Sequence, residues 1–170
     1  MISKVRYDPL IHDRHSLRLK GYDYTNPGYY YVTINVQDQI HLFGEVENNK
    51  IHYNKFGRIV RKTWLWLERQ YTYIELDEWI LMPDHLHGII AYKSNGSGRS
   101  QMASTVIKPL GRLIGAFKTV STKKINSARN TPGCRIWQRD FYDHIVRDNN
   151  DLERIRWYIT NNPKNAYHDP

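Results

Sequence analysis

Two histidines separated by a single residue, His85 and His87, are the side chains of this sequence best suited to chemistry. In an extended strand, residues i and i+2 project from the same side, so both imidazoles would lie on one face of a sheet. Neighbouring imidazoles can share a metal ion, although ordinary surface or core strands carry the same H-x-H pattern. Gly88 follows the pair and would let backbone or ligand come close. The pattern therefore predicts part of a metal site that needs a further ligand from elsewhere in the chain.

The residues that follow the pair exclude other histidine-based motifs. Ile89 and Ile90 stand where the H-x-H-x-D-H pattern of metallo-hydrolases requires Asp and His. Ile89 also stands where a histidine-triad nucleotide hydrolase requires its third histidine. The H-E-x-x-H and Walker A patterns are absent from the sequence.

A tyrosine and an asparagine near the C-terminal end, Tyr158 and Asn162, are candidates to complete the site. They are four residues apart, so on a helix they share one face. An amide oxygen from Asn162 would join the two imidazoles, and such a mixed set suits Mg²⁺ or Mn²⁺ when water or phosphate oxygens fill the remaining positions. Tyr158 would then stand one helical turn from the metal. The structural alternative is a tyrosine packed on a sheet and a helix C-cap before Pro163.

Composition restricts the class of protein. The 170 residues predict one domain, 1–170, and 25 Lys+Arg against 17 Asp+Glu give a net charge of +8, which favours a polyanionic partner such as nucleic acid. The single cysteine, Cys134, excludes an intramolecular disulfide and fits a reduced, cytoplasmic setting. No apolar run approaches the ~18 residues of a membrane span, so we expect no membrane partner. Residues 1–20 are expected to form a basic arm rather than a signal peptide.

Hydrophobic periodicity predicts the elements that must position these side chains. Three segments have strand composition, and a fourth would be a hairpin turning at Asn48-Asn49: these are residues 29–36, 73–82 and 85–92, and the hairpin arms 42–46 and 50–53. Two amphipathic helices are predicted over 55–70 and 105–126, and a short strand with a loop over 135–146. A last helix is expected over 151–162, capped by Asp148 or Asn149 and ended by Pro163.

The order of these elements contains a β-α-β-β-α-β core, which is the ferredoxin-like pattern. The predicted fold class is α+β, with an antiparallel sheet, two helices on one of its faces, and a C-terminal helix added across the sheet. A polar loop at 93–104 has no predicted role.

Two motifs together resemble a known family. Pro83-Asp84-His85-Leu86-His87-Gly88, followed later by the Tyr-Ile-Thr-Asn-Asn-Pro of residues 158–163, resembles the single-tyrosine HUH transposases, where U is a bulky apolar residue. The closer resemblance is to the REP-associated tyrosine transposases. Supporting stretches are residues 18–24, 28–33 and 137–144, and the resemblance spans residues 16–168.

The resemblance implies a ferredoxin-like fold, a divalent metal (Mg²⁺ or Mn²⁺) on His85 and His87, and Tyr158 as nucleophile on a catalytic C-terminal helix. It implies a substrate of single-stranded DNA near a hairpin, of the kind found in repetitive palindromic elements. Asn162 matches the polar metal ligand one turn after the tyrosine, where many insertion-sequence relatives carry the longer Gln. Alternative ligands are His144 and Glu75, and the alternative nucleophile is Tyr142.

Basic and aromatic side chains are the candidates for DNA contact. Those expected to bind phosphates are Arg18, Lys20, Lys108, Arg112, Lys118, Lys123, Lys124 and Arg139. Trp137, with Phe141 and Tyr142, is a candidate for stacking on extruded bases. The oligomeric state is open between a monomer and a homodimer that shares each site between chains.

Three other functions remain open at this level. A replication initiator or conjugative relaxase would use the same chemistry, but those chains are usually longer and often add a third histidine or a helicase. A non-catalytic single-strand nucleic-acid-binding domain on this fold would keep the charge and aromatics without needing His85, His87 and Tyr158 together. A domesticated transposase would bind its sites without mobilising them.

Overall fold

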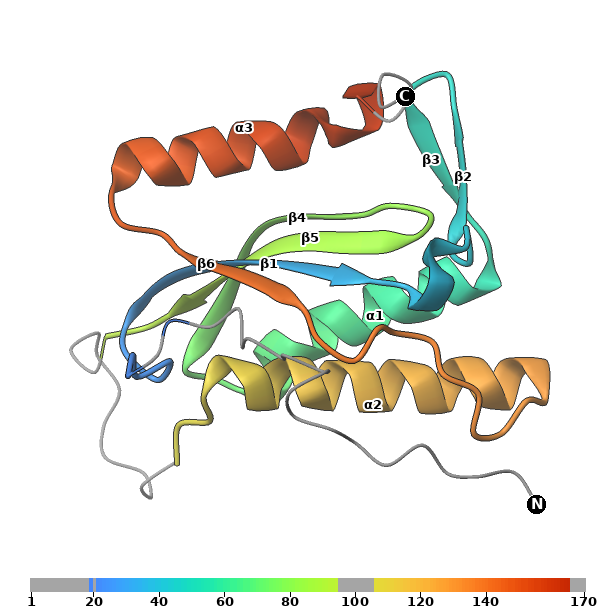
Figure 1. Ribbon diagram of the computed structural model, residues 1–170, viewed down its shortest axis with the longest axis horizontal. Coiled ribbons are helices and arrows are strands. Elements are labelled where there is room, and N and C mark those ends of the chain that lie inside the picture. Colours follow the sequence, from blue (N-terminus) through green and yellow to red (C-terminus); the bar gives the residue numbers. More distant parts are fainter. Residues whose placement is uncertain (1–18, 20, 95–105, 166–170) are drawn as a thin grey trace, which may run out of the picture.

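The structure is a computed structural model, and it describes residue 19, residues 21–94 and residues 106–165 (Figure 1). The elements in chain order are β1 (Gly28–Asn35), a 3-10 turn η1 (Gln37–Gln39), β2 (Gly44–Glu47), β3 (Lys50–Tyr53), α1 (Lys55–Gln70), β4 (Ile74–Leu81), β5 (His85–Tyr92), α2 (Leu110–Arg129), β6 (Tyr142–Ile145) and α3 (Asn149–Asn165). Among these described helices, none combines the length and apolar character that a bilayer crossing requires.

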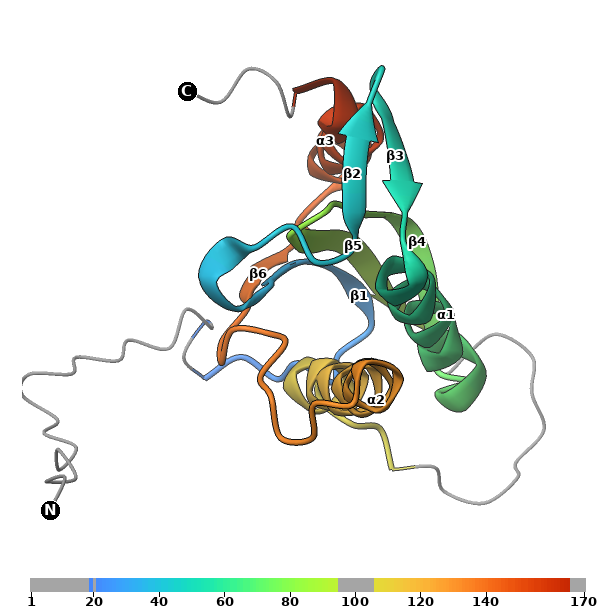
Figure 2. The same ribbon diagram turned by 90° about the vertical axis from the view of Figure 1, so that its right-hand side faces the viewer.

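A four-stranded antiparallel sheet of order β4-β5-β1-β6 forms the centre of the molecule. Helices α1 and α2 cover one face of this sheet, and α3 lies across the other face (Figures 1 and 2). The β2–β3 hairpin forms a separate two-stranded sheet between β1 and α1 in the chain. This arrangement is the predicted α+β, ferredoxin-like fold with an added C-terminal helix, and the prediction is confirmed.

Helix α1 has the bounds that its periodicity predicted. The side chain of Asn54 caps it by accepting hydrogen bonds from the amides of Phe56 (2.8 Å) and Gly57 (3.0 Å). Its stripe of Val60, Trp64 and Leu67 is fully buried against the sheet and α2. The stripe places α1 directly behind β5, on the face opposite the two histidines.

Helix α2 begins at Leu110, so the predicted start at residue 105 is wrong. Pro109 has an extended conformation (ψ 154°) and precedes the helix, and a residue before proline avoids helical backbone angles. The helix also runs three residues beyond the predicted end at Asn126, to Arg129, where Asn130 ends it in the left-handed conformation (φ 55°).

Helix α3 is longer at both ends than the predicted 151–162. Asp148 caps its start, because its Oδ1 accepts the amide N–H of Asp151 at 2.9 Å. Pro163 does not end the helix, which extends to Asn165. A proline this close to a C-terminus costs one backbone hydrogen bond and leaves the final turn able to form.

The sheet separates two apolar cores of unequal size. The larger lies between the sheet and α1/α2. The smaller, here called the α3 cluster, consists of Ile89 from β5 with Leu152, Ile155 and Ile159 from α3. Burial of each such side chain contributes about 1.5–3 kcal/mol, so these few residues supply much of the attachment of α3 to the sheet.

Gly88 has a different role from the ligand approach that its position suggested. A Cβ atom at this residue would lie 2.7 Å from Cζ2 of Trp64 and 3.2 Å from Cβ of Trp79. The space beside Gly88 is therefore filled by the indole of Trp64, which packs against the strand immediately behind His87.

We predict that Gly88→Ala destabilises the protein by about 1–3 kcal/mol, because the new methyl group overpacks a rigid indole. The matched control is Gly115→Ala, within α2, where a Cβ would meet nothing within 4 Å. That substitution should be neutral or stabilising by up to about 1 kcal/mol. Urea unfolding measures both, and equal midpoints for the two variants would contradict this packing role.

Candidate active site

His85 and His87 lie side by side on the face of β5 that α3 covers. Their ring centroids are 4.5 Å apart at an interplanar angle of 70°. Leu86 between them points into the larger core, where it is fully buried. The alternation expected from a strand therefore holds, and the two imidazoles form a pair.

A carboxylate orients His85. Nδ1 of His85 donates to Oδ1 of Asp84 at 2.6 Å, since a carboxylate oxygen can only accept. In the neutral ring this leaves the lone pair on Nε2 available to a ligand. Burial works to raise the pKa of Asp84, but its hydrogen bond and charge interaction with His85 outweigh burial and hold that pKa below its usual value.

Two hydroxyl groups surround His87 instead. Its Nδ1 lies 2.8 Å from the hydroxyl of Tyr31 and 2.9 Å from that of Thr33. Burial, followed by the neighbouring His85, lowers the pKa of His87 to about 3. The ring is therefore neutral at physiological pH, which is the form that can ligate a metal. Burial likewise raises the pKa of Tyr31 to about 12 and keeps its phenol protonated.

Tyr158 reaches this pair from the other side, on α3. Its ring centroid lies 5.3 Å from that of His87, edge-on at 70°, and 42% of the residue is exposed. A half-exposed phenol beside two imidazoles is accessible to an incoming substrate. Asn162, one turn later on α3, is buried at 8% exposure. Ile155 and Ile159, on the sheet-facing side of the helix, are also buried.

An ion pair reinforces the α3 cluster in holding α3 on the sheet. Arg156 donates from Nε to Oδ1 of Asp77 at 2.9 Å and from Nη2 to Oδ2 at 2.5 Å. Asp77 lies at a register shift of β4 between Leu76 and Trp79. The hydrogen bonds from Arg156 lower the pKa of Asp77. This forked contact fixes the helix backbone close to Tyr158, which follows Arg156 on the next half-turn of α3.

His85 and His87 fit a divalent metal ion whose remaining coordination positions would be filled by water or phosphate oxygens. Within the described part of the chain, no group of three or more His, Cys, Asp or Glu side chains could hold an ion. His85 and His87 each have Nδ1 engaged by a hydrogen-bonding partner, which is the outer-shell arrangement usual for metal-binding histidines. Asn162 remains the predicted third protein ligand.

The alternative ligands and nucleophile lie in other surroundings. Nε2 of His144 is 2.7 Å from Oδ2 of Asp151 at the start of α3. Glu75 pairs in register with Ala91, towards the opposite end of β5 from His85, and faces Lys93 at 3.9 Å. Tyr142 is 48% exposed and its ring contacts Tyr31 rather than His87 (6.2 Å between centroids).

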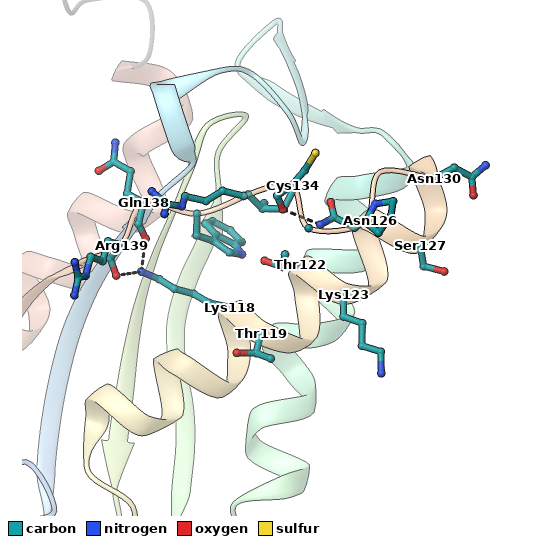
Figure 3. Close-up of a pocket in the computed structure, with 15 residues that line it drawn as sticks. Lys118, Thr119, Thr122, Lys123, Asn126, Ser127, Asn130, Cys134, Gln138 and Arg139 are labelled. Carbon is teal, nitrogen blue, oxygen red and sulfur yellow. Dashed lines mark hydrogen bonds between the residues drawn. The ribbon is translucent and has the colours of Figure 1, made fainter. Parts of the chain in front are cut away.

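Several of the predicted DNA contacts lie together along a cleft beside the C-terminal half of α2. Its volume is about 790 Å³, and its cationic lining residues are Lys118, Lys123, Arg135 and Arg139 (Figure 3). Among the described residues that line this cleft, none is Asp or Glu. Because α2 and α3 cover opposite faces of the sheet, the cleft and the histidine pair belong to different sides of the molecule (Figure 1).

Two residues of this cleft have structural roles. Trp137 is only 4% exposed and packs on Phe43 and Phe117, with its indole N–H donating to Ser121 at 2.9 Å, so its ring is not presented to a base. Nζ of Lys118 donates to the carbonyl oxygens of residues 138, 139 and 140 at 2.9, 3.3 and 2.9 Å. Lys118 therefore organises the loop that forms one wall of the cleft.

The remaining predicted phosphate contacts are dispersed. Arg112 borders a second, smaller cleft with Tyr22 and Asp23, and the ammonium of Lys108 lies 5.2 Å over the ring of Tyr71. Lys124 is exposed on α2. Arg18 and Lys20 lie outside the described residues, as do most of the predicted arm and loop.

The sequence motifs do not identify Tyr31, Thr33, Asp77 or Arg156 as parts of the site. Tyr31 and Thr33 carried one signal, since residues two apart in a strand share a face. Their relation to His87 needed the β1–β5 register, in which Thr33 is opposite His87. Arg135, which lines the cleft, carried no signal beyond its charge.

No family model matches the chain. An uncharacterized protein of Haemophilus influenzae is 32% identical to it over 168 residues, which cover 93% of this chain and 92% of the relative. A solved structure of a REP-associated tyrosine transposase bound to a REP hairpin matches with a TM-score of 0.60 at 18% identity, over 88% of this chain and 74% of that chain. The fold is thus that of a REP-associated tyrosine transposase. The chain belongs to the same family as the Haemophilus influenzae protein.

A double-mutant cycle tests whether Arg156 and Asp77 anchor α3. Replacing each by Ala, singly and together, should give a coupling free energy of roughly 0.5–2 kcal/mol in urea unfolding, because the pair is forked and partly buried. The exposed pair Lys93–Glu75 is the control and should couple by less than about 0.5 kcal/mol.

The coupling should also depend on pH in one direction. The pKa of Asp77 is lower in the folded protein, so the contribution is complete above the unfolded value of about 3.9 and is lost as pH falls through the folded value. Equal couplings in both pairs at neutral pH would show that Arg156–Asp77 does not anchor the helix.

Proposed function

We propose that this protein is a metal-dependent single-strand DNA endonuclease and transposase that cleaves and rejoins DNA near hairpins through a 5′-phosphotyrosine. The observation that carries the proposal is the approach of Tyr158, from α3, to the neutral His87 beside His85 on β5. The REP-associated tyrosine transposase of the same fold is bound to a REP hairpin, which supports hairpin DNA as the substrate class.

His85 and His87 would hold Mg²⁺ or Mn²⁺ through Nε2, with the amide oxygen of Asn162 as the third protein ligand. When bound, the ion supplies Lewis-acid polarisation and a template for the scissile phosphate. The neutral state of His87 suits this role because no proton needs to leave the ring before it ligates.

Tyr158 performs the covalent step. Its phenolic oxygen attacks phosphorus in line, forming the tyrosine–phosphate bond while the bond to the 3′ oxygen breaks. The phenol loses its proton and the departing 3′ oxygen gains one, giving a 5′-phosphotyrosine and a free 3′-hydroxyl. Attack by a 3′-hydroxyl on that linkage releases Tyr158 and reseals the strand, so the energy of the phosphodiester is conserved and no ATP is required.

Binding and chemistry would occupy different sides of the molecule. The described residues that line the cleft beside α2 include no carboxylate. Lys118 is bound to three carbonyl oxygens, so Lys123, Arg135 and Arg139 are the cations that suit the phosphate backbone of the hairpin. The histidine pair would receive the single strand that leaves the hairpin. The net charge of +8 would draw DNA to both surfaces.

Cleavage of labelled single-stranded hairpin oligonucleotides, taken from repeats flanking the gene, tests the proposed chemistry. With Mg²⁺ or Mn²⁺, the wild type should yield a cut product and a covalent protein–DNA adduct on a denaturing gel. Tyr158→Phe should abolish the adduct because the nucleophile is missing, and His85→Ala should abolish it because a ligand is missing. Tyr142→Phe is the control and should retain it.

Other outcomes would redirect the proposal. Cleavage that persists in Tyr158→Phe and disappears in Tyr142→Phe would move the nucleophile to Tyr142. Tight binding by the wild type without cleavage at any metal concentration would leave a single-strand DNA-binding protein.

A separate prediction concerns the binding of hairpin DNA in the cleft beside α2. The double variant Lys123→Ala/Arg135→Ala should weaken hairpin binding and reduce the slope of log affinity against log salt by about 1.4–1.8, the value for two lost phosphate contacts. The control Lys62→Ala/Arg69→Ala removes the same charge from the exposed surface of α1. Equal losses from both doubles would mean that only net charge matters.

A further inference from the structure

Tyr31, Thr33 and His87 form a closed triangle of polar atoms beneath α3. Nδ1 of His87 is 2.8 Å from the Tyr31 hydroxyl and 2.9 Å from the Thr33 hydroxyl, and the two hydroxyls are 3.1 Å apart. In the β1–β5 register Thr33 is directly opposite His87, and Tyr31 lies two residues earlier on the same face. The triangle is enclosed, since His87 is only 5% exposed.

Two hydrogen arrangements fit these contacts. Thr33 donates to the oxygen of Tyr31, and then either the Tyr31 hydroxyl donates to Nδ1 or an Nδ1–H donates to the hydroxyl oxygens. The hydroxyls engage Nδ1 in both arrangements, so Nε2 is the ring nitrogen left for a metal. A neutral ring that binds metal through Nε2 must carry its proton on Nδ1.

We propose that Thr33 and Tyr31 are positioning residues that hold His87 in the tautomer able to bind metal through Nε2. The inference rests on the proposed metal site, but the tautomer itself is a property of the metal-free protein. In water the neutral imidazole of histidine favours the opposite tautomer, so the fold must impose this one. Neither residue touches the substrate in this account.

The two histidines use different partners because their burial differs. His85 is paired with the carboxylate of Asp84, whose side chain is 27% exposed and still reaches water. A carboxylate beside the nearly buried His87 would carry a large desolvation cost. Two neutral hydroxyls satisfy Nδ1 without placing a charge there, and the ring of Tyr31 stacks on that of His87 at 22° with 5.8 Å between centroids.

Substitutions that keep shape and remove hydroxyls separate positioning from packing. Thr33→Val preserves the branched side chain, and Tyr31→Phe preserves the stacked ring. Thr33→Ser removes a methyl group and keeps the hydroxyl, so it is the rescue variant. Comparing amide NMR spectra with the wild type establishes that each variant remains folded.

The experiment has two readouts that need no catalysis. Long-range ¹H–¹⁵N NMR on histidine-labelled, metal-free protein reports the tautomer of His87, assigned by its loss in His87→Ala. The wild type and Thr33→Ser should show the proton on Nδ1, and Thr33→Val/Tyr31→Phe should shift it towards Nε2. Calorimetric titration with Mn²⁺ should show affinity about 10- to 100-fold lower in the double variant and close to wild type in Thr33→Ser.

The outcomes distinguish this inference from the proposed function. A wild-type His87 with its proton on Nε2, or a folded double variant that binds Mn²⁺ as tightly as the wild type, would overturn the positioning role. A wild type with the proton on Nδ1 that binds no Mn²⁺ would support the tautomer assignment and contradict the metal-dependent function.

Discussion

The docking of α3 on the open face of the sheet is the constraint on which the site depends. His85 and His87 belong to β5, whereas Tyr158 and Asn162 belong to a helix that reaches the sheet only after β6. The α3 cluster and the forked Arg156–Asp77 contact hold this helix in place. Without them the phenol and the imidazoles would have no fixed relation, because the connecting residues 146–148 and the contact of His144 with Asp151 hold the start of the helix and not the part that carries Tyr158.

The centre of the candidate site carries no charge, because His87 and the hydroxyl groups that contact it are neutral. His87 is buried and uncharged, and its partners are hydroxyls. The carboxylate of Asp84 is hydrogen-bonded to the more exposed His85. A site of this kind can take up a divalent cation together with a phosphate without first displacing a resident counter-ion. Lys123, Arg135 and Arg139, which we propose bind DNA phosphates, line the cleft beside α2, behind the sheet. In the proposed function, DNA binding and chemistry would therefore occupy opposite faces of the sheet.

Local patterns predicted much of the fold but only part of the site. The helix at 55–70 has its predicted bounds because its hydrophobic periodicity is strong. The strand at 85–92 also has its predicted bounds, and the H-x-H spacing placed both imidazoles on one face. Asp77 could not be paired with Arg156 from sequence, since 79 residues separate them and a register shift in β4 sets the position of Asp77. Trp137 is an aromatic residue that the sequence predicts to stack on DNA bases, but it is buried in the core. Such features depend on tertiary contacts that periodicity does not encode.

The most direct test of the account measures the proximity of Tyr158 to a metal on the histidine pair in solution. Protein labelled with fluorotyrosine would be titrated with Mn²⁺, with the Tyr158 signal assigned from its absence in Tyr158→Phe. Mn²⁺ should broaden the ¹⁹F signals of Tyr158 and Tyr31 first, spare Tyr73 on the far side of the sheet, and have no such effect in His85→Ala. Bound Mn²⁺ that leaves the Tyr158 signal sharp would contradict the central claim that α3 places this tyrosine at a metal site.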